Sequence, residues 1–209
     1  VANRVDYVTV LLQEKDVKFD MEHFPYLYYK TISCTCSDDY YKTKSGVDGD
    51  CQHIWSILKS ASEDSTKRLT KKPKDLIKPE KKKHLKYIMA ARQLCQKLLH
   101  YPRKKYEKKE INKDDDCYHD LLIWSLFANR QDLASLFWLK CKNQLETAVL
   151  ASCVLKQMAA KAKSGKDQAL FNSIKEHSEL FERRSLDLQT KLYEEDADIA
   201  MDLMLTEDT

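Results

Sequence analysis

Two cysteine-containing pairs are the residues whose types and spacing come nearest to a chemical site. Cys34 and Cys36 are separated by one residue, and Cys51 and His53 repeat that spacing after 14 intervening residues. Thiolate sulfur and imidazole nitrogen are the usual ligands of structural zinc, so the two pairs could close a tetrahedral site. Structural knuckles, however, separate the ligands of each pair by two or more residues. We therefore favour the interpretation that these four side chains do not share a metal ion. Zinc binding is the open alternative.

A lysine-rich stretch could bind an anionic partner. Residues 67–86 hold 10 lysine or arginine residues against 2 acidic ones, and they include Lys81, Lys82 and Lys83. Such a stretch is attracted to an anionic membrane surface or to nucleic acid. Binders of single strands interleave aromatic side chains for stacking, and none occurs here. A solvated linker is therefore favoured, with contact to anionic lipid or calmodulin as the alternative, and no nucleic-acid partner is expected.

The sequence contains no recognisable catalytic motif. It has no nucleophile elbow, Walker loop, GxGxxG or HExxH pattern, and 3 glycines cannot supply a glycine-rich phosphate cradle. Consecutive carboxylates at residues 114–116 point in different directions, so they suit the positive N-terminal end of a following helix better than a metal. The histidines other than His53 stand apart from one another. We therefore expect no catalytic residue, no cofactor and no enzyme activity.

The composition indicates an all-α fold. The 209 residues include only 3 glycines and 4 prolines, which is too few for a sheet joined by tight turns. No run of about 18 apolar residues is present, so we expect no membrane-spanning helix within the sequence. The 7 cysteines are odd in number and scattered. That pattern indicates reduced, cytosolic thiols and not a disulfide framework.

The most apolar stretch, residues 119–141, predicts a buried helical hairpin. Residues 121–128 are apolar on nearly every side, which is typical of a helix enclosed by others. Asp132 stands where an N-cap belongs, and apolar residues then recur at helical spacing. The predicted structural core of this hairpin is Leu121, Trp124, Leu133, Phe137 and Trp138.

The turn of this hairpin has a counterpart near the N-terminus. Residues 2–12 and 128–138 both contain Ala-Asn-Arg-x-Asp, followed by apolar residues in the same register. Repeated hairpins with one turn chemistry indicate a stack of helical repeats, although a single repetition can also arise by chance. If residues 2–6 form a hairpin turn, its first helix precedes Val1, so we expect the chain to be cut from a longer one.

Composition divides the chain into four predicted segments. Residues 60–83 are assigned as a basic flexible linker, because they lack aromatic residues and enough apolar surface to fold alone. Beyond the central hairpin, periodicity predicts helices over 145–162, 168–193 and 197–205. The complete division is a helical-hairpin segment over 1–59 that is cut at its N-terminal side, the linker over 60–83, a helix with a charged connection over 84–116, and a helical-hairpin repeat segment over 117–209.

Charge is unevenly distributed along the chain. Residues 60–116 contain 18 lysine or arginine residues against 9 acidic ones, whereas residues 167–209 contain 4 against 12. Such asymmetry matters for association even when the net charge of the chain is only +3. The acidic C-terminal region could therefore face a basic surface in a neighbouring subunit.

The central hairpin resembles the cytosolic N-terminal homology region of the melastatin-type transient receptor potential (TRPM) cation channels. That region carries a D-L-L-x-W…N-R…L-A…F-W hairpin, and residues 120–124, 129–130, 133–134 and 137–138 match it in order. Residues 148–156, 181–203 and 2–28 also resemble parts of the same region. Residues 42–116 match poorly. No pore, coiled coil, kinase or Nudix segment is present in the sequence.

The resemblance implies an all-α stack of helix-turn-helix hairpins with a structural role. That role would be assembly and gating transmission in a calcium-permeable cation channel, without catalysis. The implied partners are other domains of the same channel and neighbouring subunits in a homotetramer. The implied location is the cytosolic face of the plasma membrane, as part of an integral membrane channel. The alternatives are an unrelated soluble α-solenoid scaffold that binds a protein partner, and a zinc-dependent or nucleic-acid-binding module.

Overall fold

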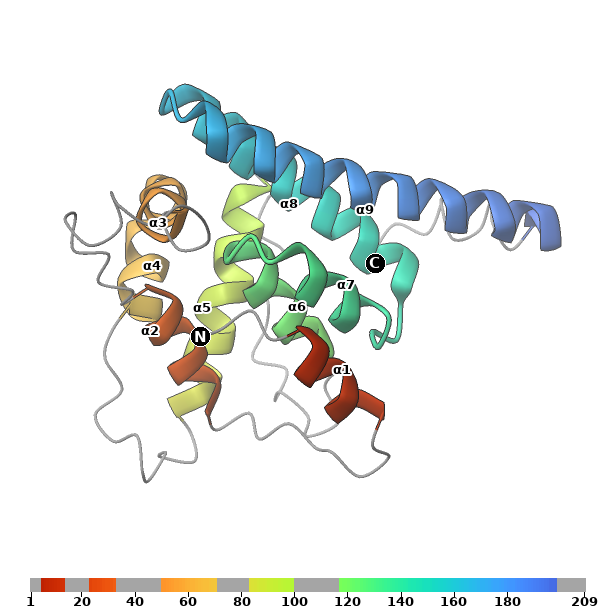
Figure 1. The fold of residues 1–209 in the computed structure, drawn as a ribbon, viewed down its shortest axis with the longest axis horizontal. Coiled ribbons are helices and arrows are strands. Elements are labelled where there is room, and N and C mark those ends of the chain that lie inside the picture. Colours follow the sequence, from red (N-terminus) through yellow and green to blue (C-terminus); the bar gives the residue numbers. More distant parts are fainter. Residues whose placement is uncertain (1–4, 14–22, 33–49, 71–82, 100–116, 199–209) are drawn as a thin grey trace.

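A computed structural model describes residues 5–13, 23–32, 50–70, 83–99 and 117–198 of the chain. Within these ranges the secondary structure is helical and contains no strand, which confirms the predicted all-α fold. None of the described helices is both long and apolar enough to cross a membrane. Figure 1 shows the long C-terminal helix along one side of the molecule, with the shorter helices gathered beneath it.

The described helices are numbered in chain order. Three of them precede the linker region, and four follow residue 116. Their bounds are α1 (Val5–Gln13), α2 (Phe24–Ile32), α3 (Asp50–Ala61), α4 (Glu63–Thr70), α5 (Lys83–Leu98), α6 (Cys117–Phe127), α7 (Gln131–Trp138), α8 (Gln144–Ser164) and α9 (Gln168–Glu195).

The hairpin of α6 and α7 lies at the centre of the hydrophobic core. Every residue from 120 to 127 is buried, because α5, α7 and α8 all pack against α6. The structure buries all five residues that the sequence placed in the core, namely Leu121, Trp124, Leu133, Phe137 and Trp138. A helix with so little polar surface cannot stand alone in water, which explains its position inside the stack.

The turn between α6 and α7 corrects the predicted N-cap. The N-cap of α7 is Arg130, which makes no side-chain cap hydrogen bond, and Asp132 is the second residue of the helix. Asn129 has φ of 49°, a left-handed conformation that ends α6 early enough for α7 to begin at Gln131. Asp132 therefore acts on the helix dipole from the first turn. Asp6 is likewise the second residue of α1, so the two Asp residues share one position.

Residues 63–70 form helix α4, so the prediction of a flexible linker over 60–83 is wrong for this part. Leu69 is completely buried in α4, and the helix packs against α2, α3 and α5. Residues 71–82 lie outside the described residues.

Short hydroxyl side chains explain how so polar a helix packs closely. Ser62, Ser65 and Thr66 are buried. The Ser62 Oγ accepts from the backbone N–H of Ser65 at 3.3 Å and from the Lys97 Nζ at 2.9 Å. The Thr66 Oγ1 donates to the Ser62 carbonyl at 2.6 Å. The buried Ser62 and Thr66 hydroxyls therefore both have hydrogen-bond partners, which composition alone could not reveal.

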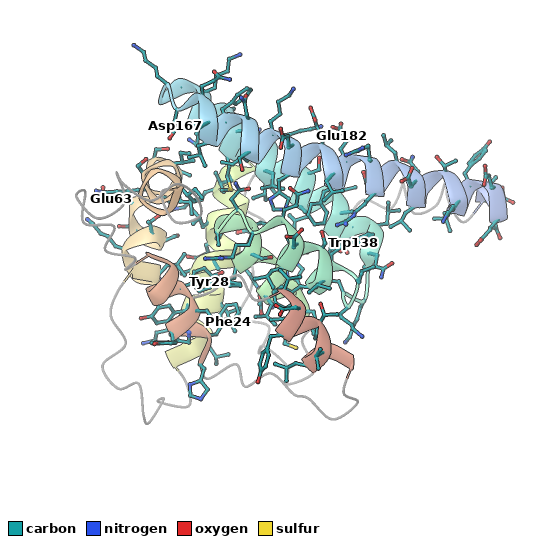
Figure 2. All side chains as sticks on the ribbon, in the orientation of Figure 1. Phe24, Tyr28, Glu63, Trp138, Asp167 and Glu182 are labelled. Atoms are coloured by element: carbon teal, nitrogen blue, oxygen red, sulfur yellow. The ribbon has the colours of Figure 1, made fainter. Side chains whose placement is uncertain are left out.

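A buried ion pair joins α5 to α6. The Arg92 Nε donates to the Asp120 Oδ1 at 2.9 Å, and the Arg92 Nη2 donates to the Asp120 Oδ2 at 3.0 Å. The Asp120 side chain is only 4% exposed, whereas that of Arg92 is 21% exposed. Tyr28 of α2 is buried nearby and meets Phe24 edge to face, and burial raises the pKa of its hydroxyl well above the usual value (Figure 2).

The last two described helices form a long hairpin. Asn143 caps α8 by accepting from the Glu146 backbone N–H, and Asp167 caps α9 by accepting from the Leu170 backbone N–H. Lys166, in the turn, has φ of 60°. Buried alanines of α8 allow close approach to its neighbours. They are Ala148, Ala151, Ala159 and Ala162.

Candidate functional site

The cysteines and histidine of the zinc hypothesis are only partly placed by the structure. Cys34 and Cys36 lie outside the described residues, while Cys51 and His53 lie in the first turn of α3. Across the part of the chain that the structure describes, no three His, Cys, Asp or Glu side chains gather as a metal site would need.

One of the three lysines predicted to contact lipid lies within the described residues, at the start of α5. Lys83 is the first residue of that helix, and Lys81 and Lys82 lie outside the described residues. The specific polar contacts lie elsewhere, where the α6–α7 hairpin meets α9.

One such contact joins the α6–α7 turn to α9. The Asn129 Nδ2 donates to the Ser173 Oγ at 2.8 Å, and the Asn129 Oδ1 lies 3.0 Å from the His177 Nδ1. Because the Asn129 amide nitrogen faces Ser173, its amide oxygen faces His177 and accepts a hydrogen bond from the ring nitrogen Nδ1. His177 is therefore the tautomer with hydrogen on Nδ1. Its buried Nε2 has no hydrogen-bond partner among the described atoms.

The surroundings of His177 hold it neutral. Burial first, and the Arg184 guanidinium second, lower the pKa of His177 from 6.5 to about 3. The ring also packs on Phe181, with 5.5 Å between the ring centroids. A proton added at Nε2 would therefore be buried without an acceptor, close to a positive charge.

His177 should make the stability of the fold depend on pH. The unfolded chain protonates this residue below about pH 6.5, whereas the folded chain does so only near pH 3. Its contribution is complete above pH 6.5 and decreases by about 1.4 kcal/mol for each pH unit below that value. Urea unfolding from pH 7 to pH 4 should show a smaller loss of stability for His177→Gln than for the native chain. Identical pH profiles would contradict this role for His177.

A second contact places Arg184 of α9 against α7. The Arg184 guanidinium lies 4.8 Å from the Trp138 ring centroid and 5.1 Å from that of Phe181. The Arg184 Nη1 also donates to the Ser135 Oγ at 2.9 Å. A planar cation next to two aromatic rings adds attraction that depends on its orientation. The Arg184 and Asn129 contacts together attach α9 to the α6–α7 hairpin, one near each end of α7.

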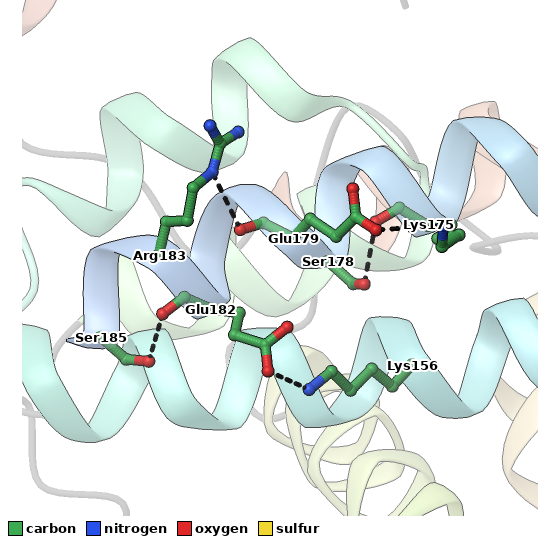
Figure 3. A network of polar contacts seen from close by, with 7 residues as sticks. All are labelled: Lys156, Lys175, Ser178, Glu179, Glu182, Arg183 and Ser185. Atoms are coloured by element: carbon green, nitrogen blue, oxygen red, sulfur yellow. Dashed lines mark hydrogen bonds and ion pairs between the residues drawn. The ribbon is translucent and has the colours of Figure 1, made fainter. Parts of the chain in front are cut away.

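The outer side of the α8–α9 hairpin carries a shallow, charged pocket. The Lys156 Nζ and the Glu182 Oε1 are 2.6 Å apart across the two helices, and Lys175 pairs with Glu179 within α9 at 3.2 Å (Figure 3). The Lys163 Nζ lies 5.7 Å from the centroid of the Phe171 ring. These side chains and two alanines line a volume of about 300 Å³. The pocket is open and contains no nucleophile paired with a base.

The described polar side chains at these contacts hold helices together. Sequence reasoning missed the residues that do so, Asn129, His177 and Arg184. Asn129 carried one signal, since an Asn in a turn tolerates the left-handed conformation. The partners 48 and 49 residues away left no sequence signal.

Residues 1–209 match the family described as the TRPM2-like domain. The chain is 30% identical over 118 residues to the human transient receptor potential cation channel subfamily M member 6, covering 53% of this chain and 6% of that protein. It is 24% identical over 153 residues to the rat subfamily M member 2, covering 73% of this chain and 10% of that protein. The aligned part thus spans a tenth or less of the length of these relatives.

Proposed function

The chain belongs to the TRPM2-like domain family of melastatin-type transient receptor potential channels, and from that premise we propose that it is a cytosolic assembly and gating-transmission domain of a calcium-permeable cation channel. The observation that carries the proposal is the attachment of α9 to the α6–α7 hairpin through His177 and Arg184. Directional polar contacts between packed helices make the two elements move together. Such coupling is what a transmitting domain requires.

The remaining parts of the proposal follow from the same family. The domain is non-catalytic, lies on the cytosolic side of the plasma membrane, and contacts other domains of its channel and neighbouring subunits in a homotetramer. Both named relatives are described as members of a cation channel subfamily, which supports this setting. The similarity to these relatives also favours a channel domain over an unrelated α-solenoid scaffold.

A chimeric channel tests the transmitting role. The matching segment of the rat subfamily M member 2 would be replaced by this chain, and cation current and surface tetramers would be measured in the same cells. We expect the chimera to assemble and conduct. Arg184→Ala should reduce the current while leaving the surface tetramer intact, because it loosens α9 from α7.

The adjacent residue supplies the matched control. Arg183 is exposed, and its Nε donates only a long bond of 3.4 Å to the Glu179 carbonyl of its own helix. Arg183→Ala should therefore leave the current unchanged. Equal currents for the two variants, or a native chimera that forms surface tetramers without current, would contradict gating transmission.

Contact with anionic lipid remains part of the proposal at Lys81, Lys82 and Lys83. Each lysine near an anionic leaflet contributes about 1 kcal/mol, so three should produce measurable binding to liposomes that contain anionic lipid. The interaction is expected to weaken with salt, since exposed charges are screened within about 10 Å at 0.1 M. Replacing all three lysines by glutamine should abolish sedimentation with the liposomes. Binding that persists in half-molar salt, or that ignores the substitution, would rule out this electrostatic contact.

A further inference from the structure

The open pocket on the outer side of the α8–α9 hairpin is a groove between the two helices, and its surroundings are basic. Residues 156–175 contain five lysines and one acidic residue. From α9 the groove is lined by residues between Phe171 and Glu182, and from α8, at helical spacing, by Lys156, Ala159, Ala160 and Lys163. We call these lining residues, together with Lys166 in the adjoining turn, the basic groove.

The positive charge of the basic groove is only partly neutralised within the chain. Its two carboxylates each already pair with a lysine, at 2.6 Å and 3.2 Å (Figure 3). Lys163 and Lys166 are exposed and take part in no ion pair among the described residues. The Lys163 ammonium instead lies over the Phe171 ring. The groove therefore offers positive charge beside an aromatic ring and two alanines that permit close approach.

The C-terminal end of α9 is acidic and exposed. Residues 186–198 contain five acidic residues and one lysine. The buried residues of α9 all precede residue 182, and Figure 1 shows the end of this helix running past the other described helices. Leu186 is 55% exposed and Tyr193 is 57% exposed. Because they are seven residues apart, the two side chains lie on one side of the helix. We call residues 186–198 the acidic end of α9.

The basic groove and the acidic end cannot meet within one copy of the chain. Phe171 and Tyr193 are 22 residues apart in one continuous helix, which separates them by about 33 Å. A contact between the two surfaces therefore requires a second copy.

We propose that the acidic end of α9 in one copy of the chain docks in the basic groove of a neighbouring copy. The proposal rests on the proposed homotetramer and gives it a specific interface. Tyr193 enters the groove, whose volume is about 300 Å³, and lies beside Phe171 of the neighbouring copy. There it exchanges contact with water for contact with an aromatic ring.

Charge fixes which surfaces meet. Glu194 and Glu195 follow Tyr193 directly, so they face Lys163 and Lys166 when Tyr193 occupies the groove. Complementary charge of this kind selects the partner and the orientation of the contact. Because two different surfaces are joined, each copy contributes one of each, and successive contacts close a ring when the rotation between copies fits.

Reversing the charge of either surface tests the proposal in the full 209-residue chain. Sedimentation velocity at low salt would measure self-association of the native chain and of two charge-reversed forms. These forms are Lys163→Glu with Lys166→Glu, and Glu194→Lys with Glu195→Lys. Each should weaken association by at least about tenfold, because like charges then face one another. Arg68→Glu with Lys86→Glu, at exposed positions of α4 and α5, is the matched control and should leave association unchanged.

Mixing the two charge-reversed forms separates a contact from damage to the fold. The acidic groove of one form then matches the basic end of the other, and the reverse is also true. The mixture should therefore associate as tightly as the native chain. A loss that mixing does not restore, or reversals without any loss, would overturn the proposal. A native chain that remains monomeric at low salt would overturn it as well.

A disulfide between copies locates the contact. Ala160 lines the groove, and Thr190 is exposed three residues before Tyr193. The chain would carry Ala160→Cys and Thr190→Cys, with the exposed Cys153 replaced by serine. Thr190 lies eight residues, or about 12 Å, beyond the last groove residue of α9. A disulfide needs Cα atoms within about 7 Å, so a link between positions 160 and 190 must join two copies.

Mild oxidation should give covalent dimers in which peptide mass spectrometry finds the link between positions 160 and 190. Adding Lys163→Glu with Lys166→Glu should remove that link. Self-association without the link would show that copies meet elsewhere and would overturn the proposal. Failure of this interface would leave the proposed channel role standing, because the current of the chimera and its response to Arg184→Ala are measured separately.

Discussion

Trp124→Ala is expected to lower the free energy of unfolding by about 3–5 kcal/mol, the usual range for removing a large buried aromatic side chain. Trp124 is 3% exposed and lies in α6, whose residues 120–127 are all buried. Because the surrounding helices cannot collapse into the space, a cavity remains at the centre of the stack. Urea unfolding followed by circular dichroism would measure the change in midpoint.

An aromatic side chain at the surface provides the comparison. Tyr7 of α1 is 61% exposed, so Tyr7→Ala should change stability by roughly 0.5 kcal/mol or less. If the Trp124 and Tyr7 variants melted at the same temperature as the native chain, the α6–α7 hairpin would not be the core of the fold.

Arg92→Leu should be about equally damaging, for an electrostatic reason. It leaves the Asp120 carboxylate, which is 4% exposed, without the two hydrogen bonds that Arg92 now donates. Removing one partner of a buried ion pair typically costs about 3–5 kcal/mol. The surface pair of Lys67 and Glu63 is the control, because both side chains are more than half exposed. Lys67→Ala should leave the melting temperature unchanged.

The double variant Arg92→Leu, Asp120→Leu separates charge from packing. Replacing both members of a buried pair by apolar residues is often nearly neutral, so the double variant should regain most of the stability that Arg92→Leu loses. A double variant as unstable as the single one would show that the alkyl packing of Arg92, and not the unpaired carboxylate, accounts for the loss.

The sequence predicted best where one kind of residue dominates locally. The run from Leu121 to Phe127 has no polar side apart from Ser125, so it could only be a buried helix, and the structure places it there. The α8–α9 hairpin also follows its periodicity, with ends within two residues of those predicted. The N-cap of α7 was misplaced because the left-handed conformation of Asn129 shortened the turn.

Features that depend on distant partners could not be predicted. α4 has one large apolar residue, Leu69, and is stable because α2, α3 and α5 bury it. Asp120 and His177 looked like ordinary polar residues, but their partners lie 28 and 48 residues away. Such pairs follow from the packing of the helices, which a single sequence does not encode in any local pattern.

The length of α9 has a mechanical consequence. The helix has 28 residues, and its fixed points at His177 and Arg184 lie near its middle. From Phe181 to Glu195 is about 21 Å, so a tilt of about 5° at the fixed points would carry the far end through about 2 Å. Sub-ångström adjustments around Trp138 would thus appear as larger displacements at residue 195. A tilt of α9 about His177 and Arg184 would therefore move its C-terminal end further than its middle.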